Sequence, residues 1–202
     1  MRIFRDVEKA KATLFRQHPL EMVEVPPALK QRIKDVFGED LTPSQAVERI
    51  IAGVRDRGDD ALVDYTRMLD GVELPSLESD EEDMARALRE VPLGLVSALT
   101  MAAERIRSFH RAHKPESSLD YSEGGLGQLR IPLQRVGVYA PGGTASYPST
   151  VLMTAIPARI AGVEEVIVAT PPQAGGVAPL VLAACALAGV DRVFAMGGAQ
   201  AI

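Results

Sequence analysis

The region between residues 135 and 196 constrains the fold most, because short runs rich in β-branched residues alternate there with longer apolar segments. Strand, helix and strand at this spacing are typical of right-handed crossovers between neighbouring strands of a parallel sheet. The strand segments are almost continuously apolar, which favours a sheet covered by helices on both faces. The pattern predicts an α/β fold with strands at 135–140, 165–170 and 192–196 and helices at 149–161, kinked by Pro157, and 177–188.

The sequence before this region predicts helices. Thr42, Pro43 and Gln45 combine an N-cap, a proline at the first helical position and a capping box, and apolar residues then recur at helical spacing up to Gly58. Near residue 115 the composition changes to glycine-rich and then β-branched segments. We therefore expect a helical N-terminal segment, residues 1–115, that packs on an α/β unit formed by residues 116–202, with further helices at 60–69, 79–89 and 92–113.

Composition and charge narrow the class of protein. Of the residues, 47% are hydrophobic and 24% are charged, as in globular domains. The net charge is −5 and the Lys and Arg residues are scattered, which argues against a nucleic-acid partner. No stretch approaches the roughly 20 apolar residues that span a bilayer, and the N-terminus lacks a signal-peptide pattern. We expect no membrane partner and a cytoplasmic location.

Cysteine and histidine give little sign of a metal site. The single cysteine, Cys185, lies in an apolar helical run and is expected to be an inert core residue. His110 and His113 are one helical turn apart, a spacing that can place two imidazoles near one ion, whereas His18 lies in a polar segment. No third ligand clearly joins the pair, so we favour a solvated helix end over a metal site.

Ligands of open parallel sheets bind beyond the carboxyl ends of the strands, so the three loops there are candidate binding segments. Pro141, Gly142 and Gly143 allow a close backbone approach to a ligand, and the helix that follows offers N–H groups to an anion such as a pyrophosphate. The same residues also suit a simple tight turn, and they do not form the G-x-G-x-x-G pattern of dinucleotide-binding folds.

Two polar side chains end the first and third predicted strands. Tyr139 could stack against a flat ring and hydrogen-bond through its hydroxyl, although a tyrosine at a sheet edge often has no such role. Gln200 follows two glycines, where its amide could contact a ribose or a base or could serve the backbone of its own turn. Each residue alone leaves both interpretations open.

Three longer motifs carry a family resemblance. They are VERIIAGVRDRGDDALVDYTRMLDG, RVGVYAPGGTASYPSTVLMTAIPARIAGVEEVIVATPP and the C-terminal LAGVDRVFAMGGAQAI. Together, and in this order, they resemble histidinol dehydrogenase over roughly residues 40–202. The resemblance implies a helical N-terminal segment followed by an incomplete Rossmann-like βαβαβ unit, because the C-terminal half of the family chain has no counterpart here.

The resemblance also implies a function. Members of the family oxidise L-histidinol through L-histidinaldehyde to L-histidine, the last step of histidine biosynthesis, with NAD and a bound zinc, and they form homodimers. By similarity, Tyr139 and Gln200 match positions that contact NAD. The matching loops beside them contain Pro141, Gly142, Gly143 and Pro171.

The family's catalytic and zinc-binding residues all correspond to positions beyond Ile202. We therefore expect no catalytic residue and no metal ligand in this chain, and no histidinol oxidation by the chain alone. Two alternatives stay open: a non-catalytic module of the same fold that binds a nucleotide or a partner protein, and another α/β nucleotide-binding enzyme that shares only the fold.

Overall fold

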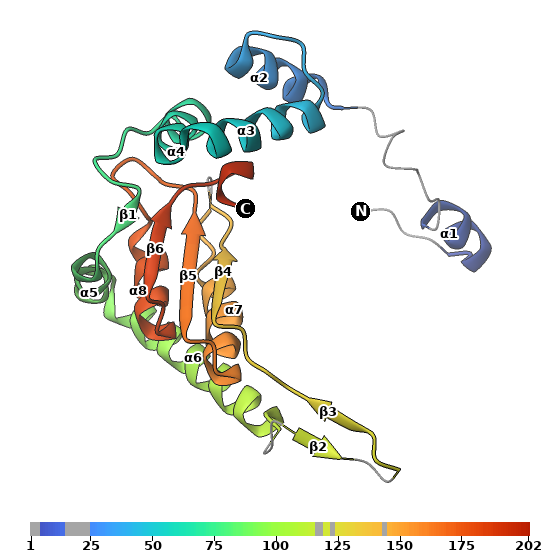
Figure 1. The fold of residues 1–202 in the computed structure, drawn as a ribbon, viewed down its shortest axis with the longest axis vertical. Helices are drawn as coiled ribbons and strands as arrows, with labels where there is room; N and C mark the ends of the chain where they lie inside the picture. Colours follow the sequence, from blue (N-terminus) through green and yellow to red (C-terminus); the bar gives the residue numbers. More distant parts are fainter. Residues whose placement is uncertain (1–4, 15–24, 116–118, 122–123, 143–144) are drawn as a thin grey trace. The chain divides into compact units, whose positions relative to one another are not determined.

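The computed structural model of the chain describes residues 5–14, 25–115, 119–121, 124–142 and 145–202 (Figure 1). The chain divides into two compact units, residues 1–47 and residues 48–202. The change of composition near residue 115 falls inside the second unit, so the division of the chain at that point stays a prediction.

The first unit is helical. It contains α1 (Val7–Leu14), α2 (Pro27–Phe37) and the start of α3 (Pro43–Arg57). The predicted capping box of α3 is confirmed: the Gln45 N–H donates to Thr42 Oγ1 at 3.3 Å, and Thr42 N–H donates to Gln45 Oε1 at 2.9 Å. These two bonds satisfy backbone donors that the first turn of a helix leaves without partners.

The helices before the sheet differ from the prediction in two places. A helix was expected at 60–69, but α4 (Asp59–Tyr65) passes into a π-helical turn, η2 (Thr66–Asp70). The next helix, α5 (Glu81–Glu90), begins two residues later than expected, with Asp80 and Asp83 as its capping box. The reason is a long-range pairing, because β1 (Glu78–Ser79) joins β6 and takes Ser79 out of the helix.

The predicted α/β fold is confirmed. The sheet has the order β1-β6-β5-β4, and β4, β5 and β6 are parallel, whereas β1 is an antiparallel edge strand that the sequence did not predict. These elements are β4 (Arg135–Tyr139), α7 (Pro148–Ala161), β5 (Glu165–Thr170), α8 (Pro179–Ala188) and β6 (Arg192–Ala195).

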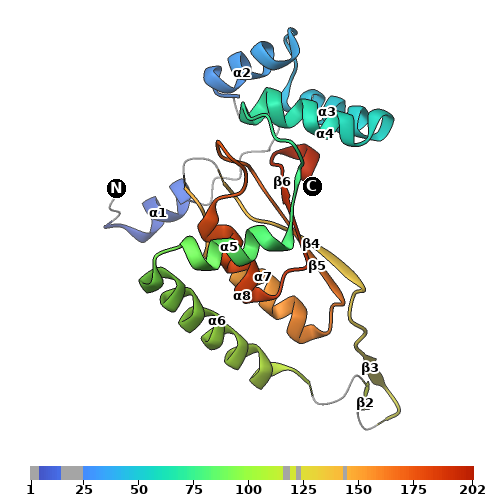
Figure 2. The ribbon, with the colours of Figure 1, turned by 90° about the vertical axis from the view of Figure 1, so that its left-hand side faces the viewer.

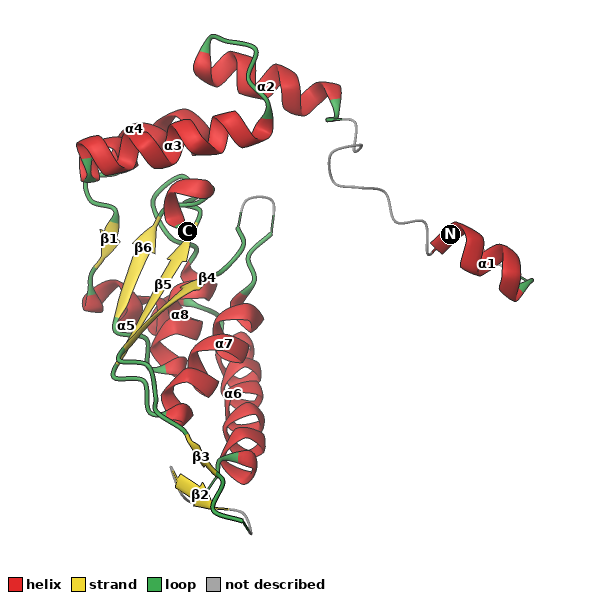
Figure 3. Ribbon diagram, turned by 45° about the vertical axis from the view of Figure 1, so that its right-hand side comes forward, coloured by secondary structure: helices red, strands yellow, loops and turns green. Residues whose placement is uncertain are grey.

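The expectation that helices cover both faces of the sheet is wrong for the described part of the second unit. Figures 2 and 3 show α7 and α8 on the same face of the sheet, with α5 and α6 (Leu93–His113) beyond them. Two right-handed crossovers that step in the same direction place both helices on one side. Burial alternates accordingly, since Val166 and Val168 are fully buried and Ile167 between them is partly exposed.

The core lies between the sheet and α7 and α8. Val151, Leu152 and Ile156 of α7 are almost fully buried, which confirms that this helix packs against the sheet. The helix continues through Pro157, and the expected kink there stays a prediction. Cys185 of α8 is fully buried, and burial raises the pKa of its thiol to about 12, which confirms a core role.

The glycine-rich segment near residue 125 forms a feature that the sequence did not predict. It connects β2 (Leu119–Tyr121) and β3 (Gly127–Leu129), a two-stranded antiparallel hairpin. Gly124 and Gly125 both have positive φ, 101° and 79°, which suits the turn between the strands. Among the described residues, no helix has both the length and the apolarity to cross a bilayer.

Candidate binding site at the carboxyl edge of the sheet

The three predicted loops meet at one edge of the sheet. β4, β5 and β6 run in the same direction, with Tyr139 opposite Ala169 and Thr170 opposite Ala195, so their carboxyl ends lie side by side. The Ala140 N–H donates to Ala169 O at 2.9 Å and extends the pairing of β4 and β5 by one residue. Parallel register therefore brings together segments that are about thirty residues apart in sequence.

Pro171 lies at the centre of this edge, between two glycines from the other loops. A Cβ atom on Gly197 would lie 2.6 Å from Pro171 Cγ, and one on Gly142 would lie 3.0 Å from Pro171 Cδ. The first distance is too short for any side chain without a shift of the loops, and the second is a tight contact that requires a small shift. The absence of a Cβ at these two positions thus allows the β4 and β6 loops to close on the β5 loop.

Gln200 has the most distinctive chemistry at this edge. It lies in the short 3₁₀ helix η3 (Ala199–Ala201), and its exposed fraction is 8%. Within the described part of the chain, neither Nε2 nor Oε1 of its amide has a hydrogen-bond partner. Burying an amide without partners costs free energy, so such a group indicates a missing ligand or water. Gly198, with φ of 62°, lies against the amide, since a Cβ there would be 2.7 Å from Gln200 Oε1.

Tyr139 faces the same loop. Its hydroxyl oxygen accepts a long hydrogen bond, 3.4 Å, from the backbone N–H of Gly198. The hydroxyl proton is not used in that contact and can donate to a further acceptor. Tyr139 at the end of β4 and Gln200 in η3, both predicted from the sequence, thus lie against the same residue, Gly198.

The positions of the other predicted residues differ. Gly142 and Pro171 form the centre of the edge, Pro141 is exposed, and Gly143 lies outside the described residues. Gly197 and Gly198 were not predicted as site residues, although two glycines shortly before Gln200 indicate a close backbone approach.

The start of α7 offers less to an anion than the sequence suggested. Pro148 is the first helical residue and has no N–H group, and the Thr150 N–H donates to Tyr147 O at 3.1 Å. Residues 145–147 precede this helix, so its first turn does not directly follow Gly142. The contacts that this edge can offer therefore come mainly from Tyr139 and Gln200 rather than from a helix N-terminus.

Comparison with known proteins identifies the family. The model of the family described as histidinol dehydrogenase matches residues 38–202. The chain belongs to this family. Histidinol dehydrogenase of Methanosarcina mazei is 54% identical over 77% of this chain and 37% of its own length. That of Deinococcus radiodurans is 46% identical over 100% of this chain and 46% of its own length.

A solved structure agrees with this result. The crystal structure of histidinol dehydrogenase from Elizabethkingia anophelis matches with a TM-score of 0.71 and 29% identity, over 88% of this chain and 42% of that chain. The chain thus spans less than half the length of these histidinol dehydrogenases.

Metal ligands do not gather in the described part of this chain. No three His, Cys, Asp or Glu residues lie close enough there to hold an ion. His113 Nδ1 lies 2.7 Å from Phe109 O, a contact within α6, and His18 lies outside the described residues. The described residues therefore offer no three-ligand group for a zinc ion, and the absence of metal ligands from this chain stays a prediction.

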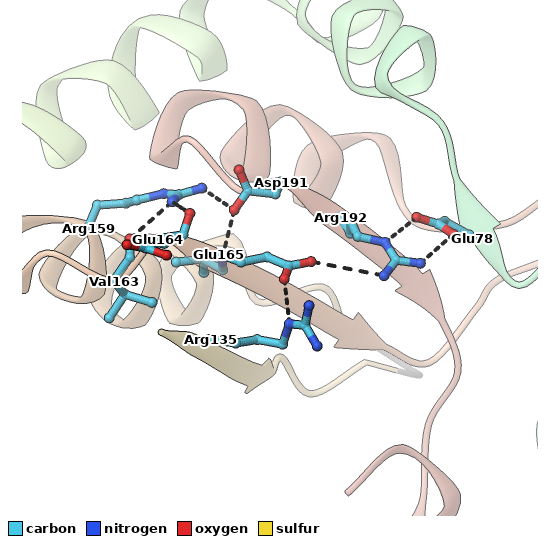
Figure 4. Close-up of polar contacts among 9 residues, drawn as sticks. Glu78, Arg135, Arg159, Val163, Glu164, Glu165, Asp191 and Arg192 are labelled. Carbon is cyan, nitrogen blue, oxygen red and sulfur yellow. Dashed lines mark hydrogen bonds and ion pairs between the residues drawn. The ribbon is translucent and has the colours of Figure 1, made fainter. Parts of the chain in front are cut away.

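Charged residues instead join the opposite, amino end of the sheet (Figure 4). Arg192 holds Glu78 through two hydrogen bonds, of 2.7 and 2.9 Å, and Glu165 pairs with Arg135. The bond from the Arg192 guanidinium lowers the pKa of Glu78, and the same bond raises the pKa of Arg192. These contacts link β1, β4, β5 and β6 at the amino end of the sheet.

Proposed function

We propose that this chain provides part of the NAD site of a histidinol dehydrogenase, at the carboxyl edge of its sheet. The observation that carries the proposal is the buried amide of Gln200, which has neither a donor nor an acceptor partner among the described residues. A dinucleotide presents hydroxyl groups, which can donate to Oε1 or accept from Nε2, and adenine ring nitrogens, which can accept from Nε2. The amide thus fits a ligand with mixed polarity.

Two further features support this assignment. The Tyr139 hydroxyl can donate to the same ligand, and its ring gives a flat apolar surface beside it. The glycines around Pro171 keep Cβ atoms away from the edge, which allows a ligand to approach the backbone. A bound NAD would supply the hydride acceptor, while these residues would hold and orient it.

The overall reaction that we propose is the oxidation of L-histidinol through L-histidinaldehyde to L-histidine, in a homodimer with zinc, as in the family. We also propose that the chain alone does not perform this reaction. Its carboxyl-edge loops, residues 139–147, 170–172 and 197–200, contain no His, Asp, Glu or Lys. Oxidation of an alcohol requires a base to take the hydroxyl proton, and these loops offer no carboxylate, imidazole or amine for that role.

The first experiment is a titration of the chain with NAD, followed by protein-observed NMR. Gln200→Leu should weaken NAD binding about tenfold or more, because the hydrogen bonds of the amide are lost. The variant should fold as well as the parent, since it removes an amide that has no partner in the fold. Gln128→Leu is the matched control, because Gln128 is an exposed residue of β3, outside the carboxyl-edge loops. It should bind NAD like the parent.

Equal binding by the Gln200→Leu variant and the parent would refute the proposed site. If the parent showed no NAD binding at all, the non-catalytic alternative would gain support. A separate assay for NADH formation with L-histidinol and zinc tests the claim of inactivity, and turnover by the unmodified chain would contradict it.

A further inference from the structure

A second candidate site lies at the end of the molecule opposite Gln200. A cavity of about 310 Å³ opens between the last turns of α6 and α7 and the end of α8. Its charged lining residues are all cations: Arg107, Arg111, Lys114 and Arg159. A cavity lined by one sign of charge favours a ligand of the opposite sign.

Two of these cations already make hydrogen bonds and ion pairs within the fold. Arg107 donates to Leu187 O at the end of α8 and pairs with Glu104 at 2.8 Å. Arg159 donates to Gly189 O at 2.8 Å and pairs with Asp191. Both guanidinium groups therefore serve the carbonyl-rich ends of helices, where cations are favourable. These contacts also fix the two groups in place before any ligand binds.

The side chains of the other two cations make no hydrogen bond or ion pair with the described residues. Arg111 and Lys114 are exposed, and their side chains contact no carboxylate or carbonyl among the described residues. The contacts of Arg107 use two of its five N–H groups, so it keeps donors that can face the cavity. The cavity thus holds more positive charge than its neighbours Glu104 and Asp191 neutralise, in a chain of net charge −5.

The remaining lining of the cavity is apolar. Ile156 and Ile160 of α7 form one wall, beside the end of α8. Apolar walls lower the local dielectric and strengthen the attraction between the cations and an anion. The volume lies at the lower end of the range for small-molecule sites.

We propose that this cavity binds a small molecule through a phosphate or pyrophosphate group. Arg111 and Lys114 provide unpaired charge, and Arg107 provides oriented donors for the phosphate oxygens. The site is separate from the carboxyl edge and does not depend on the NAD proposal. Its position at the helix ends would couple its occupancy to the packing of α6 on α7.

The test is a titration of the 202-residue chain with inorganic pyrophosphate at constant ionic strength, followed by amide chemical shifts. Shifts should concentrate at Lys114, Ile160 and Ala188. Arg111→Gln and Lys114→Gln should each weaken binding about tenfold, because each removes one charge-assisted contact. Arg105→Gln is the matched control: it removes an exposed arginine of the same helix that does not line the cavity.

Three outcomes would overturn the proposal. The first is the absence of shifts around the cavity. The second is equal weakening by Arg105→Gln, which would indicate a diffuse attraction to the helix. The third is pyrophosphate binding that survives both variants and is displaced by NAD, which would place the anion at the carboxyl edge instead. Circular dichroism of each variant verifies that helix content is unchanged.

Discussion

The two ends of the parallel sheet differ in how their polar side chains are hydrogen-bonded. At the amino end, Asp191 accepts hydrogen bonds from the Val166 backbone and from Arg159, and Arg192 holds both oxygens of Glu78. At the carboxyl end, the Gln200 amide is buried and has no partner among the residues that the structure describes, and Gly142 and Gly197 leave no Cβ atoms against Pro171. Both ends belong to the same strands, so the difference in hydrogen bonding follows from the side chains at each end.

The difference indicates how the two ends contribute to the protein. The paired groups Asp191, Arg192 and Glu78 stabilise the amino end, and their polar atoms are already engaged within the fold. The carboxyl end gives up stability, because a buried amide without a partner costs about 1–3 kcal/mol. Such a cost is typical of a site that a ligand completes. Each prediction below tests one side of this contrast.

The largest effect is expected from Asp191→Ala at the amino end. The substitution leaves the buried Val166 N–H without its acceptor, 2.7 Å away, and removes the partner of Arg159. We expect the free energy of unfolding to fall by about 3 kcal/mol. Urea unfolding of parent and variant measures the change.

Asp191→Asn is the control for that experiment, because its amide oxygen can still accept from Val166 N–H but carries no charge. It should recover part of the loss. A decrease below about 0.5 kcal/mol for the alanine variant would show that the amino end is not a stabilising region, within the range of ordinary surface changes.

A smaller effect is expected from Gly197→Ala at the carboxyl end. The new Cβ would lie 2.6 Å from Pro171 Cγ, so the β5 and β6 loops must move apart. We expect a loss of about 1–2 kcal/mol in unfolding free energy and weaker NAD binding, because Gln200 moves with its loop. Thermal unfolding and an NAD titration measure the two effects.

Gly137→Ala on β4 is the matched control, since a Cβ there meets nothing within 4 Å. It should leave both stability and binding near the parent values. If Gly197→Ala behaved in the same way, the close approach at Pro171 would not matter, and the carboxyl end would tolerate side chains as the rest of the sheet does.

The sequence predicted the parts of this fold that depend on local patterns. The alternation of segments between residues 135 and 196 located three strands and two helices, and the capping box at Thr42 located the start of α3. It did not predict β1, because a two-residue strand exists only through its pairing with β6. It also placed helices on both faces, since apolar strands do not reveal the direction in which successive crossovers step.

The candidate site shows the same limit. Tyr139 and Gln200 were chosen from the sequence because Tyr139 ends the first strand, Gln200 follows the third, and each belongs to a recognisable motif. Their contact with NAD stays a prediction. The close approach of Gly197 to Pro171 could not, since tertiary packing sets it. The pairing of Arg159 with Asp191 joins residues 32 positions apart, and no periodicity in the sequence indicates it.

The smallest effect is expected from Glu78→Gln, which tests whether the amino end is stabilised by charge. The folded-state pKa of Glu78 is lowered, mainly by the hydrogen bond from Arg192, from an ordinary value of 4.5. A carboxyl group with a lowered pKa stabilises the folded state above its unfolded pKa, and this contribution is lost as pH falls through the folded value. The side chain is 40% exposed, so solvent screens the pair and the effect is small.

Thermal unfolding from pH 7 to pH 3 provides the measurement. The difference in melting temperature between parent and Glu78→Gln should be largest near neutral pH and should shrink below pH 4.5, where the parent carboxylate takes up its proton. Glu164→Gln is the control, because Glu164 is exposed and its carboxylate pairs with no cation among the described residues. A difference that stays constant across this range would mean that β1 is held by its backbone pairing to β6, and that the charges of the amino end add nothing to it.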